Sequence, residues 1–225
     1  MDDAGKLADR RMRMVEEQIV RRGVTDVNVV AAMRSVPRHL FLPPEREHEA
    51  YADEALPIGH GQTISQPYMV ALMTQVLRVD VRKKILDVGS GSGYQTAVLA
   101  EMAAEVFAVE RISELAERSR TVLDKLGYDN VTVVVGDGTM GLPEQAPFDG
   151  ILVAAAAPEA PRPLLHQLAD GGRLVIPLGP VHREQMLTVF TREGTGFRRD
   201  EEVYCRFVPL IGEEALGGTQ GDGAV

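Results

Sequence analysis

A glycine-rich turn between a short apolar segment and a predicted helix restricts the possible folds of this chain more than any other feature. The turn is the segment Asp87-Val88-Gly89-Ser90-Gly91-Ser92-Gly93. Glycine allows a backbone to turn tightly and to approach a bound molecule closely. A strand, a glycine turn, a helix and a second strand, in that order, typically open a parallel sheet that binds a nucleotide or a nucleoside.

The rest of the chain continues this alternation. Strands are expected near residues 84–88, 105–109, 131–135, 149–154 and 173–177, and helices near 94–102, 112–126 and 160–169. Strands that alternate with helices form a parallel sheet with right-handed crossovers. The segments 186–191 and 202–208 are expected to close the sheet as an antiparallel pair, with a turn near Gly194 and Gly196. The predicted fold class is α/β, a doubly wound, mostly parallel, Rossmann-like sheet.

The first 78 residues have a different pattern and are predicted to form a helical extension. Apolar residues at helical spacing end at Gly23, and Asp26 is expected to be the N-cap of a second helix that Pro37 ends. Residues 45–64 lack periodicity and are expected to be a loop, and Ser65 is expected to cap a helix that opens at Pro67. We expect a helical cap region over 1–78, a core over 79–212 and a disordered tail over 213–225.

Composition excludes several classes of function. The formal net charge of −9 over 225 residues argues against an extended nucleic-acid or anionic-membrane surface. The single cysteine, Cys205, excludes an internal disulfide framework and fits the cytoplasm. The histidines never fall at metal-ligand spacing, so no metal site is expected. The basic residues Arg10, Arg11, Arg13, Arg21 and Arg22 are interpreted as the solvated side of a helix.

The spacing of the glycines indicates which cofactor binds. Gly89, Gly91 and Gly93 form a G-x-G-x-G pattern, whereas dinucleotide sites carry G-x-G-x-x-G. This difference favours S-adenosyl-L-methionine (AdoMet), which has no pyrophosphate, over NAD. An NAD-dependent dehydrogenase is therefore the least favoured alternative.

Three acids fall at the ends of successive predicted strands. Asp87 is expected to order the loop or to meet the ammonium of the cofactor. Glu110, 21 positions beyond Gly89, is the candidate acceptor for the ribose hydroxyls, with a helix-entry acid paired with Arg111 as the alternative. Asp137, followed by Gly138, is the candidate acceptor for the adenine amino group, with a plain turn aspartate as the alternative.

Several motifs resemble those of one enzyme family. The segment Gly61-Gln62-Thr63-Ile64-Ser65-Gln66-Pro67-Tyr68 is similar to the signature of protein-L-isoaspartate (D-aspartate) O-methyltransferases. The resemblance extends from about Met14 to Gly212. Its other motifs are Val36-Pro37-Arg38-His39, Gly91-Ser92-Gly93-Tyr94-Gln95, Ala146-Pro147-Phe148-Asp149, residues 171–177 and Phe207-Val208-Pro209-Leu210. Leu142 and Ala154 stand where the family often has tryptophan and threonine.

This resemblance implies a repair reaction. AdoMet would methylate the free α-carboxylate of an isoaspartyl residue in a damaged protein or peptide, leaving S-adenosyl-L-homocysteine. The ester would then collapse to a succinimide without the enzyme, and part of it would reopen as aspartate. The family's catalytic serine corresponds to Ser65. Its cofactor-contacting positions correspond to Gln66, Pro67, Tyr68, Met69, Gly89, Gly91, Gly93, Glu110, Asp137 and Gly138.

Two other functions stay open at this point. One is a small-molecule O-methyltransferase, which would need a closed pocket, and the other is a protein that binds AdoMet without turnover. A peptide substrate needs an open groove, which we expect between residues 45–64 and 205–210. The chain is expected to act as a monomer, without nucleic acid or membrane.

Overall fold

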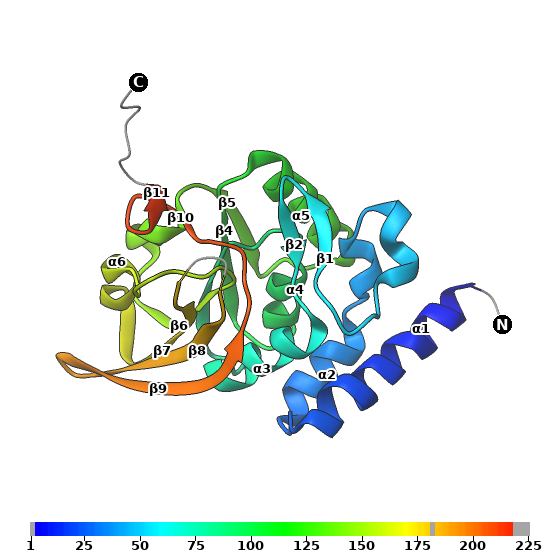
Figure 1. Ribbon diagram of the computed structural model, residues 1–225, viewed down its shortest axis with the longest axis horizontal. Coiled ribbons are helices and arrows are strands. Elements are labelled where there is room, and N and C mark those ends of the chain that lie inside the picture. The colour runs from blue at the N-terminus through cyan, green and yellow to red at the C-terminus, as the bar shows by residue number, and fades with distance from the viewer. Residues whose placement is uncertain (1–2, 181–182, 218–225) are drawn as a thin grey trace.

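The computed structural model describes residues 3–180 and 183–217 (Figure 1). Its main element is a seven-stranded sheet in the order β5-β4-β3-β6-β7-β8-β9. Strands β3 to β7 are parallel, and β8 and β9 are antiparallel to their neighbours. The strands are β3 (Lys84–Val88), β4 (Glu105–Glu110), β5 (Val131–Val135), β6 (Phe148–Val153), β7 (Leu168–Leu178), β8 (Gln185–Glu193) and β9 (Gly196–Cys205). The predicted fold class is confirmed.

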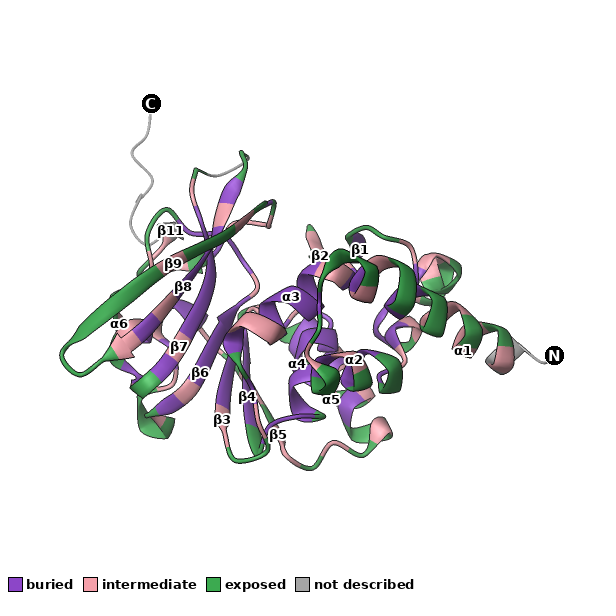
Figure 2. Cartoon of the chain, turned by 90° about the horizontal axis from the view of Figure 1, so that it is seen from below, coloured by how far each residue is buried: buried purple, intermediate pink, exposed green. Residues whose placement is uncertain are grey.

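Helices cover both faces of the sheet. Successive residues of a strand point to opposite faces, so strands β3 to β8 each contribute to two hydrophobic clusters. One cluster packs under α3 (Pro67–Leu77), α4 (Tyr94–Ala100) and α5 (Ser113–Leu126), and the other under α6 (Arg162–His166). The central strands are buried, whereas the edge strand β9 is largely exposed (Figure 2).

The N-terminal region is helical, as predicted, and packs beside α3 and α4. The Asp26 side chain accepts from the backbone N–H groups of Asn28 and Val29, which confirms it as an N-cap. The region contains α1 (Asp3–Met14), a π-helical segment (Val15–Ile19), α2 (Val27–Ser35) and 3-10 segments at Val20–Arg22, Arg38–Phe41 and Pro44–Glu49. The division of the chain at residue 78 stays a prediction.

A buried arginine joins this region to the start of α4. Arg38 is fully buried, its Nε donates to the Ala50 carbonyl at 2.8 Å, and its guanidinium lies 4.9 Å from the Tyr94 ring centroid. Burial lowers the pKa of Arg38 to about 10. Phe41 meets the same ring edge-on at 5.6 Å. The N-terminal helices therefore hold the first residue of the helix that follows the glycine turn.

Some expected boundaries are wrong. The predicted loop 45–64 contains a 3-10 segment and an antiparallel hairpin of β1 (Leu56–Gly59) and β2 (Gln62–Ile64). Four or fewer residues per strand are too few to show a period of two. The predicted helix 160–169 contains only α6, because β7 already begins at Leu168. The pairing of β7 with β6 is irregular between Leu168 and Arg173. The first residues of β7 therefore lack the apolar pattern that predicted the strand from residue 173 onward.

The C-terminal prediction was partly wrong. β9 begins at Gly196, six residues before the expected start of that strand at Glu202. Within the expected tail, β11 (Leu216–Gly217) pairs with β10 (Ile211–Gly212), and residues 218–225 lie outside the described residues.

Candidate active site

The glycine turn has the backbone geometry that only glycine adopts readily. Gly89, Gly91 and Gly93 have φ angles of 77°, 52° and 86°. A Cβ on Gly93 would also lie 2.9 Å from the Cβ of Ser119 in α5. The turn therefore carries the chain from β3 into α4 with its backbone exposed to the cavity in front of it.

Glu110, the last residue of β4, stabilises this turn. Its Oε2 accepts from the Gly91 N–H and its Oε1 from the Ile112 N–H, both at 2.9 Å, and its side chain is buried. The carboxylate therefore connects the glycine turn to the start of α5 and also lines the cavity. Its contact with the Ile112 N–H at the entry to α5 is compatible with the ribose role, because a carboxylate oxygen accepts more than one hydrogen bond.

Asp87 lies behind the turn. It is fully buried, and its Oδ2 accepts from the Thr96 hydroxyl of α4 at 2.6 Å. Burial, helped by the nearby Glu110, raises the pKa of Asp87 to about 7, although the Thr96 hydrogen bond opposes this. Its Oδ1 and the Ser90 hydroxyl are buried without a hydrogen-bond partner among the described residues. Two unpaired polar atoms beside the turn fit a site that receives a polar ligand.

Asp137 faces the C-terminal segment. Its Oδ1 accepts from the N–H and the hydroxyl of Thr139 at 2.9 and 2.7 Å, and its Oδ2 accepts from the Glu213 N–H at 2.7 Å. Despite partial desolvation, these bonds lower the pKa of its carboxyl. The neighbouring Gly138 faces the cavity, and a Cβ there would lie 2.6 Å from Val88 Cγ1.

A segment near the C-terminus, residues 208–211, closes one side of the cavity, and we call it the strap. Ala156 donates to the Val208 carbonyl at 2.8 Å, and Leu210 donates to the Ala156 carbonyl at 2.7 Å. The cavity contains about 780 Å³ of empty space, a volume that includes its opening to solvent. Its walls are the glycine turn, Glu110, Gly138, the strap and residues 62–65.

Ser65 lies at the other end of this cavity. It follows β2 and precedes Gln66, which is the N-cap residue of α3. The prediction that Ser65 caps this helix is wrong, and no side chain donates or accepts a capping bond there. The Pro67 ring occupies the first turn and removes one of the N–H groups that a cap would satisfy. The Ser65 hydroxyl is therefore not occupied by a helix cap.

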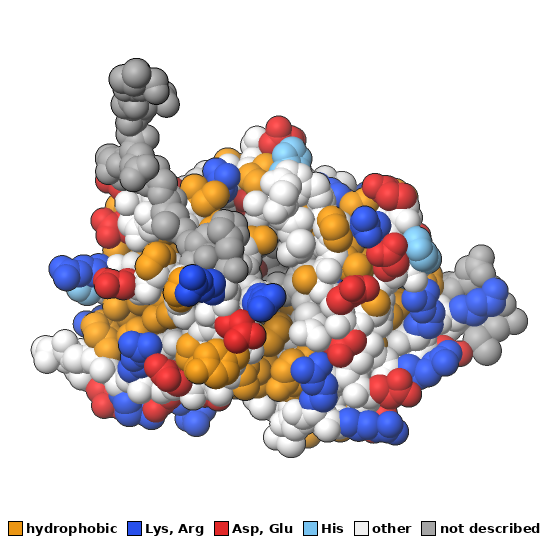
Figure 3. Space-filling view, viewed as in Figure 1, with side chains coloured by type: hydrophobic (Ala, Val, Ile, Leu, Met, Phe, Trp, Pro, Cys, Tyr) orange, Lys and Arg blue, Asp and Glu red, His pale blue; other side chains and the backbone are white. Residues whose placement is uncertain are grey.

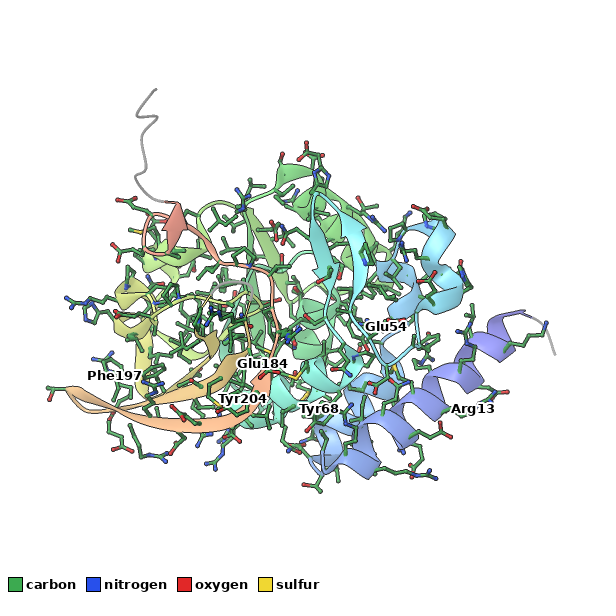
Figure 4. The ribbon with its side chains drawn as sticks, viewed as in Figure 1. Arg13, Glu54, Tyr68, Glu184, Phe197 and Tyr204 are labelled. Carbon is green, nitrogen blue, oxygen red and sulfur yellow. The ribbon has the colours of Figure 1, made fainter. Side chains whose placement is uncertain are left out.

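A second, open depression adjoins the cavity at Ser65, and we call it the groove. It lies between the N-terminal region and the end of β9, where an open groove was expected. Tyr68 on α3 and Tyr204 at the end of β9 line it from opposite sides (Figure 4). Hydrophobic side chains gather along the β8–β9 side of this face, with acidic and basic side chains among them (Figure 3).

The cavity and the groove share four residues, namely Thr63, Ser65, Ala154 and Val208. The predicted cofactor residues Gly89, Gly91, Glu110 and Gly138 line the cavity together.

Other predicted residues lie elsewhere. Gln66, Tyr68 and Met69 line the groove, and Asp87, Gly93 and Asp137 support the cavity from behind. Pro67 is buried at the start of α3. Their roles in cofactor binding stay predictions.

Sequence reasoning did not assign the strap or Arg111 to the cavity. The strap lies far from the glycine turn along the chain, and its residues were predicted only as a family motif and as one wall of the open groove. Within the described part of the chain, no group of three or more His, Cys, Asp or Glu side chains could hold a metal ion. Helices long and apolar enough to cross a membrane are likewise absent from the described residues.

The sheet order, the glycine turn after β3 and the acid at the end of β4 together define the class: a Rossmann-like, AdoMet-dependent methyltransferase. A family model described as protein-L-isoaspartate(D-aspartate) O-methyltransferase matches residues 9–215. The chain belongs to this family, as its motifs predicted.

Individual relatives support this assignment. A protein-L-isoaspartate O-methyltransferase of Methanoregula boonei is 52% identical over 206 residues, which are 92% of this chain and 94% of the relative. One from Geotalea uraniireducens is 50% identical over 208 residues, covering 92% and 96%.

Two solved structures share the fold. A protein-L-isoaspartate O-methyltransferase superposes with a TM-score of 0.81 at 27% identity, covering 92% of this chain and 67% of its own. A protein from Plasmodium falciparum, titled a putative member of this family in complex with S-adenosyl-L-homocysteine, has a TM-score of 0.78 at 29% identity, covering 89% and 98%.

Proposed function

We propose that this chain transfers the methyl group of AdoMet to the free α-carboxylate of L-isoaspartyl residues in damaged proteins and peptides. The observation that carries the proposal is the position of Ser65, at the junction of a glycine-lined cavity and an open groove. Methyl transfer to a polypeptide needs a site where an enclosed donor meets an exposed acceptor, and the residues around Ser65 form such a junction.

The residues around the cavity fit AdoMet. The glycine turn and Gly138 leave room for a nucleoside, and Glu110 is placed to accept from ribose hydroxyls. The unpaired Ser90 hydroxyl lines the cavity and the unpaired oxygen of Asp87 lies behind it, so both favour a polar group of the cofactor near the turn. AdoMet supplies a methyl group bonded to positively charged sulfur, and S-adenosyl-L-homocysteine is the product.

The acceptor needs no general base. A carboxylic acid has an unperturbed pKa of about 4, so the substrate carboxylate is already ionised near neutral pH. The protein must align this carboxylate and exclude water, and alignment alone can supply up to roughly 7–11 kcal/mol of a barrier. Ser65 performs this alignment by donating its hydroxyl to the carboxylate. A neutral donor fixes the angle of the carboxylate without removing as much of its nucleophilicity as a lysine or arginine would.

The groove favours a polypeptide acceptor over a small molecule. It is open, and aromatic and charged side chains on both sides can contact residues that flank the isoaspartate. The ester then collapses to a succinimide without the enzyme, and part of this opens to aspartate. The single cysteine supports the cytoplasm as the place of the reaction, and the negative net charge supports action as a monomer without nucleic acid or membrane.

Paired peptides test this function. The protein is incubated with labelled AdoMet and two peptides that differ only in an aspartyl or an isoaspartyl linkage. We expect base-labile methyl ester on the isoaspartyl peptide alone. Equal labelling of both peptides would contradict the specificity. AdoMet binding without labelling would instead support a silent binder, and labelling of a small carboxylic acid alone would support a small-molecule methyltransferase.

A further inference from the structure

Two charged side chains outside the cavity contact the residues that follow Ser65 and hold this segment in place. These are Arg22, at the end of the N-terminal 3-10 segment, and Asp53, which precedes β1. Both line the groove, and neither lines the cavity. Together with Gln66 and Tyr68 they form a set of contacts that we call the clamp.

The first arm of the clamp holds Gln66. The Gln66 Nε2 donates to the Asp53 carbonyl at 3.0 Å and to the Asp53 Oδ1 at 2.8 Å. Gln66 follows Ser65 directly and is the N-cap residue of α3, although its side chain makes no capping bond. Its amide instead binds a residue 13 positions earlier in the chain. This arm therefore fixes the backbone on one side of Ser65 to the N-terminal region.

The second arm holds Tyr68. The Arg22 Nη1 lies 3.3 and 3.1 Å from the two carboxylate oxygens of Asp53, and the guanidinium carbon lies 3.7 Å from the Tyr68 ring centroid. Tyr68 lies in the first turn of α3. Because Arg22 binds both Asp53 and Tyr68, the carboxylate of Asp53 joins the two arms.

Because the clamp is exposed to solvent, we expect it to affect the position of Ser65 more than the free energy of unfolding. The side chains of Arg22 and Asp53 are 40% and 44% exposed, and ion pairs at such exposure contribute little to stability. The reaction rate is far more sensitive to the position of a nucleophile, since a displacement of about 1 Å can lower it roughly 100-fold. Contacts of this kind can therefore change the rate while the fold stays intact.

We infer that Asp53 is a positioning residue: it holds Gln66 directly and Tyr68 through Arg22, and so fixes the direction of the Ser65 hydroxyl toward the substrate carboxylate. Ser65 is the residue that touches the substrate, and this role rests on the proposed function. The placement of the backbone around Ser65 by the clamp does not depend on that function.

Two measurements on the full chain test the clamp. Asp53→Ala is expected to lower kcat for an isoaspartyl peptide by roughly 10- to 100-fold. The Kd for AdoMet is expected to change less than about twofold, because Asp53 does not line the cavity. Hydrogen–deuterium exchange in a peptide covering residues 62–69 is expected to be faster than in the parent, whether or not the parent methylates isoaspartate.

Matched variants separate positioning from general damage. Asp53→Asn keeps an acceptor for Gln66, so it should recover most of the kcat that Asp53→Ala loses. Arg22→Ala should lower kcat by an intermediate factor, whereas Arg21→Ala, which removes an exposed neighbouring arginine, should not. If Asp53→Ala fails to fold, the clamp is tested by comparing kcat of Arg22→Ala with kcat of Arg21→Ala. Equal kcat in these two variants would overturn it.

The outcomes distinguish the two proposals. An unchanged kcat and unchanged exchange in Asp53→Ala would overturn the clamp, as would a loss of kcat that follows a loss of AdoMet affinity. Faster exchange at residues 62–69 in a protein whose parent does not methylate the isoaspartyl peptide would support the clamp and contradict the proposed function.

Discussion

The cavity and the groove meet at Ser65 but are built in different ways. Backbone makes much of the cavity. Gly89 and Gly91 have positive φ, the Gly91 N–H donates to Glu110, and main-chain hydrogen bonds hold the strap. Side chains from distant parts of the chain make the groove, through half-exposed contacts such as the Arg22–Asp53 ion pair.

This difference separates two tasks. A small cofactor of constant shape suits rigid, buried walls, where each lost hydrogen bond is costly. A polypeptide of variable sequence suits exposed side chains that cost little to rearrange. Changes in the cavity should therefore alter cofactor affinity or stability, whereas changes at the junction or in the groove should alter turnover.

The largest expected effect concerns the buried charge behind the cavity. The pKa of Asp87 is raised to about 7, so its contribution to stability is complete below the unfolded pKa near 4 and is lost as pH rises to about 7. Relative to Asp87→Asn, the cofactor-free protein should lose up to about 4 kcal/mol of unfolding free energy over that range. Urea unfolding at a series of pH values measures this difference, and parallel curves for the two proteins would contradict it.

The next effect concerns the carboxylate that stabilises the glycine turn. Glu110→Ala leaves the N–H groups of Gly91 and Ile112 without their acceptor and removes the ribose candidate. Because a hydrogen bond to a charged group contributes about 1.5–3 kcal/mol, the Kd for AdoMet should rise on the order of 100-fold in calorimetric titration. Glu114→Ala, an exposed acid in the first turn of α5, is the control, and an equal loss in both variants would rule out the specific role.

Ser65→Ala tests the junction. Loss of one hydrogen bond to the substrate carboxylate should lower kcat by on the order of 10- to 100-fold. The melting temperature should stay the same, because Ser65 makes no helix-capping bond. Steady-state kinetics and a thermal melt measure the two quantities. Undiminished kcat together with a lower melting temperature would show a structural role only.

The smallest effect concerns the strap. A Cβ on Gly212 would lie 2.1 Å from Asp137 Oδ1, so Gly212→Ala should displace the strap and raise the Kd for AdoMet by roughly 5- to 10-fold. Gly196→Ala is the control, because a Cβ there meets its nearest atom only at 3.9 Å. If both variants bind AdoMet with the affinity of the parent, the strap does not close the cavity.

The regular part of the fold could be predicted from sequence because its signals are local. Buried parallel strands form apolar runs, and the glycine turn marks the change from strand to helix within a few residues. Glu110 was found by the same local logic, since it lies at the end of the next strand.

The remaining features depend on contacts between distant segments. The arginines near the N-terminus were interpreted as a solvated helix side, yet Arg22 binds Asp53, 31 residues later, and the Arg11 Nε is buried. Asp137 was predicted from its position after β5, but a backbone N–H of residue 213 occupies one of its oxygens. Which residues of distant segments contact one another cannot be predicted from local patterns in a single sequence.

In the proposed function, the open groove beside Ser65 also determines which damaged residues the enzyme can reach. An acceptor must enter the groove between α3 and the end of β9. A residue that is held in a helix or a sheet of the damaged protein cannot enter it. Such a residue is reached only when its segment opens by local unfolding, and these opening free energies differ widely within one protein. The rate of repair at a buried site is therefore limited by the stability of the damaged protein around that site.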